Sequence, residues 1–154
     1  MLTNAMPIGV PESVNNYFLD YVEAGSVQQD WLTLYGEVFA GMYVNPSVLA
    51  GKQPPANPVP ARPVSFYTGR YDNAYYGPIR ITADGGSLHL LIGPRPDDYP
   101  LEHWSGDLFA FFPTGENALG ITAATFNADA GTTQAQSVTL EYYNTTGLGT
   151  FVRA

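Results

Sequence analysis

The chain has 154 residues, of which 45% are apolar and 14% aromatic, enough for one ordinary domain with a packed core. Its net charge of −8, with six Lys and Arg residues, argues against nucleic acid and anionic membranes as partners. The sequence has no apolar run near the ~20 residues of a membrane span, and its lack of cysteine excludes disulfides and thiolate chemistry.

The first residues read as the end of a strand. Residues 1–5 have the character of a strand running into a turn, with no earlier strand to pair with. No charged and apolar leader opens the sequence, so we expect no export signal in this chain. We therefore expect a fragment that begins inside a larger domain.

Two amphipathic helices are predicted next. In residues 11–25, Pro11 suits a first turn, Gly25 suits a C-terminal end, and the apolar positions with helical spacing are Val14, Tyr17, Phe18, Tyr21 and Val22. Asp30 can cap a second helix, whose apolar stripe consists of Trp31, Leu34, Tyr35, Val38, Phe39 and Met42. Both stripes require a surface to pack on.

Residues 51–64 contain five prolines in fourteen residues, which excludes a helix and favours an extended path. The segment is predicted to be a stiff connector.

From Ser65 onward the pattern changes to short β-prone runs separated by turn residues. The clearest hairpin joins residues 79–82 to 88–90 through Asp84-Gly85-Gly86, with Ile79 and Ile81 on one face and Arg80 and Thr82 on the other. The runs are residues 65–71, 77–86, 87–93, 101–104, 107–112, 119–128, 136–143 and 150–154. They predict a mainly β fold, an antiparallel barrel or sandwich of about eight strands.

Two blocks of the sequence resemble a known family. The β-prone block contains Tyr67-x-Gly69-x-Tyr71, Tyr76-Gly77-Pro78, Asp84-Gly85-Gly86, and Leu101-x-His103-Trp104 followed by Asp107-x-Phe109. It resembles the small C-terminal domain of unknown function that follows the catalytic domain in bacterial class C beta-lactamase-like (penicillin-binding-protein-like) serine hydrolases. Upstream, "LTNAMPIGVPE", "FLDYVEAG" and "DWLTLY" are similar to the segment where the last strand of that catalytic sheet meets its terminal helix.

The resemblance implies a lipocalin-like barrel (residues 65–154), a Pro-rich linker (51–64), and a helical segment from the end of a hydrolase domain (1–50). The helices would then cover a sheet that this sequence lacks. Burying two of their side chains is worth roughly 3–6 kcal/mol, so we expect self-association. The expected docking residues are Tyr17, Phe18, Tyr21, Trp31, Tyr35 and Phe39. Whether the parent hydrolase is exported to the periplasm stays open.

The nucleophile motif of these hydrolases, Ser-x-x-Lys, is absent. The one lysine is Lys52, and Leu49 stands three positions before it. Three Tyr-x-Asn triplets, at residues 43–45, 71–73 and 142–144, resemble a second motif of the family but have no serine and lysine to act with. We therefore expect no catalytic residue and no cofactor in this chain.

The spacing of His103, Ser105 and Asp107 is that of a triad on one strand face, but Ser105-Gly106 reads as a turn. We expect a hairpin in which Asp107 or Ser105 bonds local backbone. Glu102, His103 and Asp107, with Asp97 or Asp98, have the chemistry of metal ligands, but neither histidine has recognised ligand spacing, so no metal site is expected. The other histidine, His89, is expected to face away from Leu88 and Leu90.

An aromatic group is the remaining candidate site, consisting of Tyr67, Tyr71, Tyr75, Tyr76, His103 and Trp104. These rings either fill the barrel, which is our expectation, or line a small-molecule pocket or a surface docked on the hydrolase domain. The function expected from the whole sequence is a non-catalytic accessory domain that stabilises its catalytic domain, docks on it or mediates oligomers. The alternative is a free-standing lipocalin-like barrel that binds a small ligand.

Overall fold

The computed structural model describes residues 9–115 and 118–154. Their contacts divide into two compact units: the described residues up to Asn45 and those within 114–119 form one, and residues 46–113 and 120–154 form the other. The strand expected at residues 1–5 lies outside the described residues.

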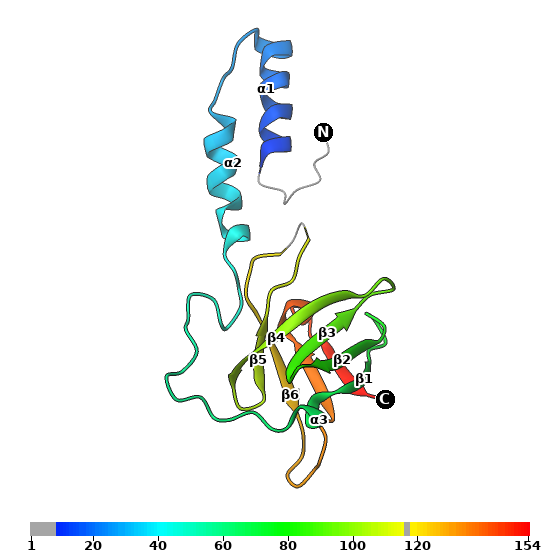
Figure 1. Cartoon of the computed structure of the whole chain (residues 1–154). Helices are drawn as coiled ribbons and strands as arrows, with labels where there is room; N and C mark the ends of the chain where they lie inside the picture. Colours follow the sequence, from blue (N-terminus) through cyan, green and yellow to red (C-terminus); the bar gives the residue numbers. More distant parts are fainter. Residues whose placement is uncertain (1–8, 116–117) are drawn as a thin grey trace. The chain divides into compact units, whose positions relative to one another are not determined.

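The first unit contains α1 (Val10–Ala24) and α2 (Trp31–Phe39), two helices that lie side by side, followed by the 3-10 helix η1 (Ala40–Tyr43) (Figure 1). Both predicted helices are confirmed. Gly25 ends α1 with φ 71°, and its N–H donates to the Tyr21 carbonyl over 3.2 Å. Asp30 caps α2, because its carboxylate accepts from the Thr33 N–H over 3.2 Å. Met42, expected in the second helix, lies in η1.

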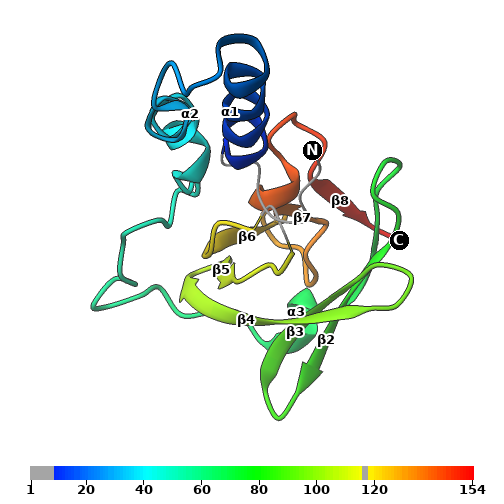
Figure 2. The ribbon, with the colours of Figure 1, turned by 90° about the horizontal axis from the view of Figure 1, so that it is seen from above.

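The second unit is a closed antiparallel barrel in which each strand pairs with its neighbours along the chain and β8 closes onto β1 (Figures 1 and 2). The predicted eight-stranded fold is confirmed. The strands are β1 (Gly69–Asp72), β2 (Ile79–Asp84), β3 (Ser87–Ile92), β4 (Asp97–Ser105), β5 (Leu108–Phe111), β6 (Thr122–Asn127), β7 (Ser137–Leu140) and β8 (Thr150–Arg153). The 3-10 helix η2 (Glu141–Tyr143) follows β7.

The β2–β3 hairpin and its two faces are as predicted. Ile79 and Ile81 are buried, whereas Arg80 is exposed, and Gly85 and Gly86 supply positive φ at the turn. His89 faces away from its buried neighbours, and its Nδ1 lies 2.8 Å from a carboxylate oxygen of Asp98.

Two expected boundaries differ in the structure. The run predicted at residues 65–71 begins as a helical turn, α3 (Val64–Tyr67), before β1. Strand β4 begins at Asp97, four residues before the predicted run, because residues 97–101 pair with β3 despite a composition typical of turns. In both places tertiary packing overrides local preference.

Large side chains fill the barrel interior. Aromatic rings from α3, β1, β5, β6 and β8 meet there, at Phe66, Tyr67, Tyr71, Phe109, Phe111, Phe126 and Phe151. Aliphatic residues of β2, β3, β4 and β7 complete this core. Helix α3 closes one end of the barrel (Figures 1 and 2), and its Tyr67 ring packs edge-on against Phe109 at a centroid distance of 5.0 Å. The expectation that side chains occupy the interior is confirmed.

The segment 46–63 lies against the outside of the barrel and is attached to it at both ends. Near its start, Leu49 is 3% exposed and packs with Trp104, Ala110 and Ala123 on the outer faces of β4, β5 and β6. Near its end, the Val59 carbonyl accepts from the Gly106 N–H over 2.7 Å. The contacts therefore group residues 46–64 with the barrel, whereas the sequence suggested a boundary after residue 50 and a connector before residue 65.

Candidate functional site

A hollow of about 360 Å³ opens beside α3, at the end of the barrel that this helix closes. Three short elements form its rim: the end of segment 46–63 with α3, the β2–β3 turn, and the middle of β4. Its lining includes Arg62, Tyr67, Ser87, Leu88, Leu101, Glu102, His103 and Phe109. Of the predicted ligand-binding residues, Tyr67 and His103 meet here.

Arg62 is fixed by a closed loop of contacts. Its backbone N–H donates to the Tyr67 hydroxyl over 2.9 Å, and that hydroxyl donates to Asp107 Oδ1 over 2.7 Å. The other carboxylate oxygen of Asp107 lies 3.3 Å from Arg62 Nε, which completes the loop. The guanidinium also stacks on the ring of Phe66, 4.5 Å from its centroid. A half-exposed arginine is thereby held in one orientation.

Tyr67 connects this loop to the core. Its side chain is buried among the rings of Phe109 and Phe126, and only its hydroxyl reaches polar partners. Burial, together with the hydrogen bond to the Asp107 carboxylate, raises the pKa of Tyr67 to about 12. The hydroxyl therefore stays protonated at neutral pH and serves as a donor to Asp107, not as an acid or a base.

Replacing Tyr67 with phenylalanine is expected to lower the free energy of unfolding by about 1–2 kcal/mol, because it leaves the Arg62 N–H and Asp107 Oδ1 without this partner. Urea denaturation followed by circular dichroism measures the change. Tyr75→Phe is the matched control, since Tyr75 is 72% exposed, and it should change the midpoint little. An unchanged midpoint in Tyr67→Phe would contradict the role assigned to this hydroxyl.

The end of β4 supplies the remaining polar groups. Pairing of β4 with β3 ends where Leu101 faces Leu88, while pairing with β5 continues to Ser105. Glu102 and His103 therefore lie on a stretch of β4 that extends past β3, next to the hollow. The His103 ring packs on Phe109 at a centroid distance of 5.3 Å, and its Nε2 lies 3.2 Å from the Gly106 carbonyl.

The triad spacing of residues 103–107 does not form a triad. The turn falls at Gly106 and Asp107, and Ser105 is the last residue of β4, with a register shift between His103 and Ser105. The expectation that Ser105 or Asp107 bonds local backbone was wrong. Ser105 Oγ accepts from the Val59 N–H over 3.1 Å, and Asp107 binds Tyr67, so both side chains hold distant segments. The turn itself was predicted correctly, but the hydrogen-bond partners of Ser105 and Asp107 are residues far away in the sequence.

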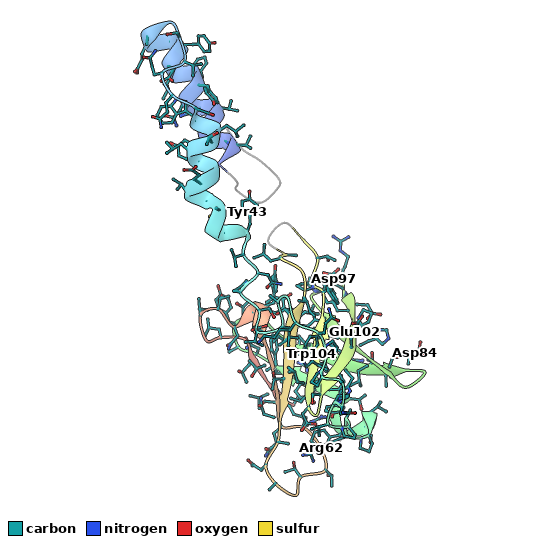
Figure 3. All side chains as sticks on the ribbon, turned by 90° about the vertical axis from the view of Figure 1, so that its left-hand side faces the viewer. Tyr43, Arg62, Asp84, Asp97, Glu102 and Trp104 are labelled. Carbon is teal, nitrogen blue, oxygen red and sulfur yellow. The ribbon has the colours of Figure 1, made fainter. Side chains whose placement is uncertain are left out.

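The other aromatic candidates lie elsewhere. Trp104 is 8% exposed and packs in the outer cluster with Leu49. Tyr76 packs on Tyr143 and Phe151 near the opposite end of the barrel, while Tyr75 is exposed there. The candidates therefore do not form one site, and Figure 3 shows the labelled Trp104 well away from Arg62.

Tyr71 belongs to a second polar cluster, around Arg153. The Arg153 guanidinium donates to the carbonyls of Phe66, Tyr67, Thr68 and Ala135 and to the Tyr71 hydroxyl. That hydroxyl in turn donates to the Tyr67 carbonyl over 2.6 Å. Burial raises the pKa of Tyr71 to about 12, although the nearby Arg153 charge opposes the shift.

The docking candidates divide into two groups. Three of them join α1 to α2: Tyr17 donates to Asp30 over 2.9 Å, Trp31 donates to Asp20 over 2.8 Å, and the Tyr35 hydroxyl lies 3.0 Å from Asn16 Nδ2. Phe39 stacks on Tyr35 within α2. Phe18 and Tyr21 face outward, 65% and 60% exposed. Val14 and Val22, at 46% and 64%, continue this apolar surface along α1. Part of the predicted stripes is therefore used in contacts within the helical unit, and the outer side of α1 remains exposed.

The polar residues that sequence reasoning missed are Arg62, Glu141 and Arg153. Glu141 accepts hydrogen bonds from Ser47, Val48, Thr122 and Ala123. Burial opposes its ionisation, but these hydrogen bonds outweigh burial and lower the pKa of Glu141 below its usual value. Each of the three sits in a proline-rich or β-prone run where nothing local marks it as special. The one available signal was the scarcity of arginine in the chain.

Among residues 9–115 and 118–154, no three His, Asp or Glu side chains are arranged to hold a metal ion. Within the same ranges no helix has the length and hydropathy to cross a membrane. The Tyr-x-Asn triplet at 71–73 is used in the fold: Asn73 Nδ2 donates to the carbonyls of Leu148 and Thr150, and its Oδ1 accepts from two backbone N–H groups.

Comparison with known proteins places this barrel in a family. The model of the domain of unknown function DUF3471 matches residues 53–147. The chain belongs to the DUF3471 family. The crystal structure of the C-terminal domain of penicillin binding protein Rv0907 is similar, with 44% sequence identity and a TM-score of 0.59. The match covers 68% of this chain and 97% of that one. No curated protein matches the chain.

The family assignment confirms the resemblance seen in the sequence. DUF3471 starts at residue 53, inside the segment that lies along the barrel, and both helices precede it. The motif Tyr67-x-Gly69-x-Tyr71 lies inside the matched range. Both of its tyrosines accept hydrogen bonds from Arg153, Tyr67 through its carbonyl and Tyr71 through its hydroxyl. The DUF3471 chain is thus similar to the C-terminal domain of a larger penicillin-binding protein.

Proposed function

We propose that this DUF3471 chain is a non-catalytic accessory domain of a penicillin-binding-protein-like serine hydrolase, and that α1 docks on the hydrolase domain of the same polypeptide. The observation that carries the proposal is the 44% identity to a C-terminal domain of a penicillin-binding protein, over 97% of that domain. The absence of a Ser-x-x-Lys pair in the sequence supports an accessory role.

The surface of α1 supports the docking part of the proposal. The side of α1 that packs on α2 is polar and includes Ser13, Asn16 and Asp20. Its apolar side chains, among them Phe18 and Val22, point outward. Amphipathic helices of folded proteins normally bury their apolar stripe, so a helix that pairs through polar groups and exposes the stripe is suited to cover another surface.

The charges of the helical segment agree with docking on protein, not on nucleic acid. Residues 1–45 contain five Asp and Glu and no Lys or Arg. Asp20 and Asp30 are used within the unit, where they accept hydrogen bonds from Trp31 and Tyr17. At 100° per residue, Glu12 and Glu23 lie on the side of α1 opposite to its apolar surface. The apolar surface is therefore free of charges that would oppose its burial.

The genomic reading frame tests the accessory role. We expect the coding sequence upstream of residue 1 to continue in frame into a domain with Ser-x-x-Lys. A stop codon directly upstream would contradict the proposal. A hydrolysis assay with a chromogenic beta-lactam and a nitrophenyl ester adds a second test, in which the chain alone should give no turnover above buffer.

Self-association of the full chain tests the docking surface. Without its partner domain, the apolar side of α1 should pair with another copy, because burying two such side chains is worth roughly 3–6 kcal/mol, or a Kd down to about 0.1 mM. Sedimentation velocity should show dimers at about that concentration and monomers for the Phe18→Asp/Val22→Asp variant. Leu19→Asp, on the same helix outside the apolar surface, is the matched control and should still dimerise. A wild-type chain that stays monomeric would contradict this surface as a docking site.

A further inference from the structure

The floor of the hollow beside α3 is part of the barrel core. Leu88, Leu101 and Phe109 are 4%, 6% and 3% exposed and belong to the interior cluster, yet all three line the hollow. Access exists because β3 begins at Ser87 while β4 continues past it to Ser105. A volume of about 360 Å³ falls within the range of roughly 300–1,000 Å³ typical of small-molecule sites.

Arg62 provides a pre-oriented anion-binding group at the rim. Asp107 occupies the Nε edge of its guanidinium, and the ring of Phe66 covers one face. Within residues 9–115 and 118–154, no protein group bonds its two terminal nitrogens. These nitrogens form the pair that binds a carboxylate in bidentate fashion. Because the side chain is already held, little conformational entropy is lost when a ligand binds.

The other charges of the hollow select a ligand with a single negative charge. Asp107 already balances the charge of Arg62, so the hollow has no spare positive charge to hold a dianion. Figure 3 shows Arg62 and Glu102 at separate places on the barrel. The Glu102 side chain therefore takes no part in holding the carboxylate of the ligand.

We propose that this hollow binds a small carboxylate with an apolar body, the carboxylate on Arg62 and the apolar body on Leu88, Leu101 and Phe109. Two sources share this chemistry: a free carboxylic acid, and an apolar amino acid or peptide C-terminus, which also carries nitrogen. The proposal is independent of the accessory role, since it concerns a site within the barrel alone.

Titration of the ¹⁵N-labelled full chain with 3-phenylpropionate tests the site. We expect saturable shifts of the amide signals of Ser87, Glu102 and His103, with a Kd of about 1 mM for a ligand of this size. Arg62→Gln should weaken binding about tenfold or more, and Arg80→Gln, an exposed arginine of β2 that lines a different hollow, should leave it unchanged. Equal binding by Arg62→Gln would overturn the proposal.

Further probes distinguish a free carboxylic acid from an amino acid as the ligand. A second variant keeps the proposal testable if Arg62→Gln fails to fold. 3-Phenylpropanamide, which lacks the carboxylate, should not bind, and binding as strong as that of 3-phenylpropionate would overturn the proposal. If phenylalanine binds more tightly than 3-phenylpropionate, the amino-acid source is supported; if 3-phenylpropionate binds more tightly, the free acid is supported. Ser87→Phe, at an exposed rim position, should fill the hollow and abolish binding while Arg62 is intact; retained binding there would count against the site.

Discussion

Replacing Gly69 with alanine is expected to lower the free energy of unfolding by about 4 kcal/mol, a large part of the roughly 5–15 kcal/mol by which domains are stable. An added Cβ would lie 2.2 Å from Arg153 Nη1, and the residue has φ 149°, where side chains are rarely found. The guanidinium would have to leave its carbonyl acceptors, and a partly buried charge that loses its hydrogen-bond partners is costly. Urea denaturation of the two proteins measures the difference.

Gly85→Ala is the matched control for this prediction. Gly85 also has positive φ, at 56°, but a Cβ there would meet nothing within 4 Å. It should cost about 1 kcal/mol, the price of backbone conformation alone. Similar losses in the two variants would mean that the contact with Arg153 adds nothing to the cost of the φ angle, which would contradict the prediction.

The Tyr67-x-Gly69-x-Tyr71 motif shows how far a sequence pattern reaches. Its resemblance to a family was readable from the residues, and the β-prone runs around it predicted the barrel correctly. What the motif does was not readable, because its partner, Arg153, is more than eighty residues away. The tyrosines looked like candidates for stacking on a ligand, whereas Tyr71 is fully buried and binds the guanidinium.

The helices illustrate the same limit. The spacing of their apolar residues and their caps predicted both helices within one residue at most ends, because these signals are local. The spacing did not reveal which stripe residues pack between the helices and which face outward. That division depends on the polar contacts of Ser13, Asn16 and Asp20, which are not apolar and were not part of the predicted stripe.

The hollow beside α3 lay beyond sequence reasoning for a related reason. His103 and Tyr67 were candidates, but Arg62 sits in a proline-rich segment that looked like a free connector. Its contacts with Asp107 and Phe66 arise only because that segment lies along the barrel. The residues of this site come from three separate segments, so no characteristic spacing in the sequence marks them as a site.

Replacing Glu141 with glutamine is expected to cost about 2 kcal/mol at neutral pH. The Glu141 carboxylate accepts from the backbone N–H groups of Val48 and Ala123 and from the hydroxyl of Ser47, over 2.8, 3.1 and 2.6 Å. A neutral amide offers one acceptor oxygen and forms weaker hydrogen bonds. Glu102→Gln, at an exposed position of β4, is the matched control and should change stability by less than about 0.5 kcal/mol.

The pH dependence of this difference identifies its origin. Hydrogen bonds lower the pKa of folded Glu141 below its usual 4.5, so the unfolded chain binds the proton more readily. The contribution of Glu141 to stability is therefore complete above pH 4.5 and is lost as the pH falls through the lower pKa of the folded state. Unfolding free energies of wild type and Glu141→Gln should differ at pH 7 and converge on acidification below 4.5. A difference that stays constant down to pH 3 would mean that the carboxylate charge does not hold segment 46–63 to the barrel, and that the packing of Leu49 does so instead.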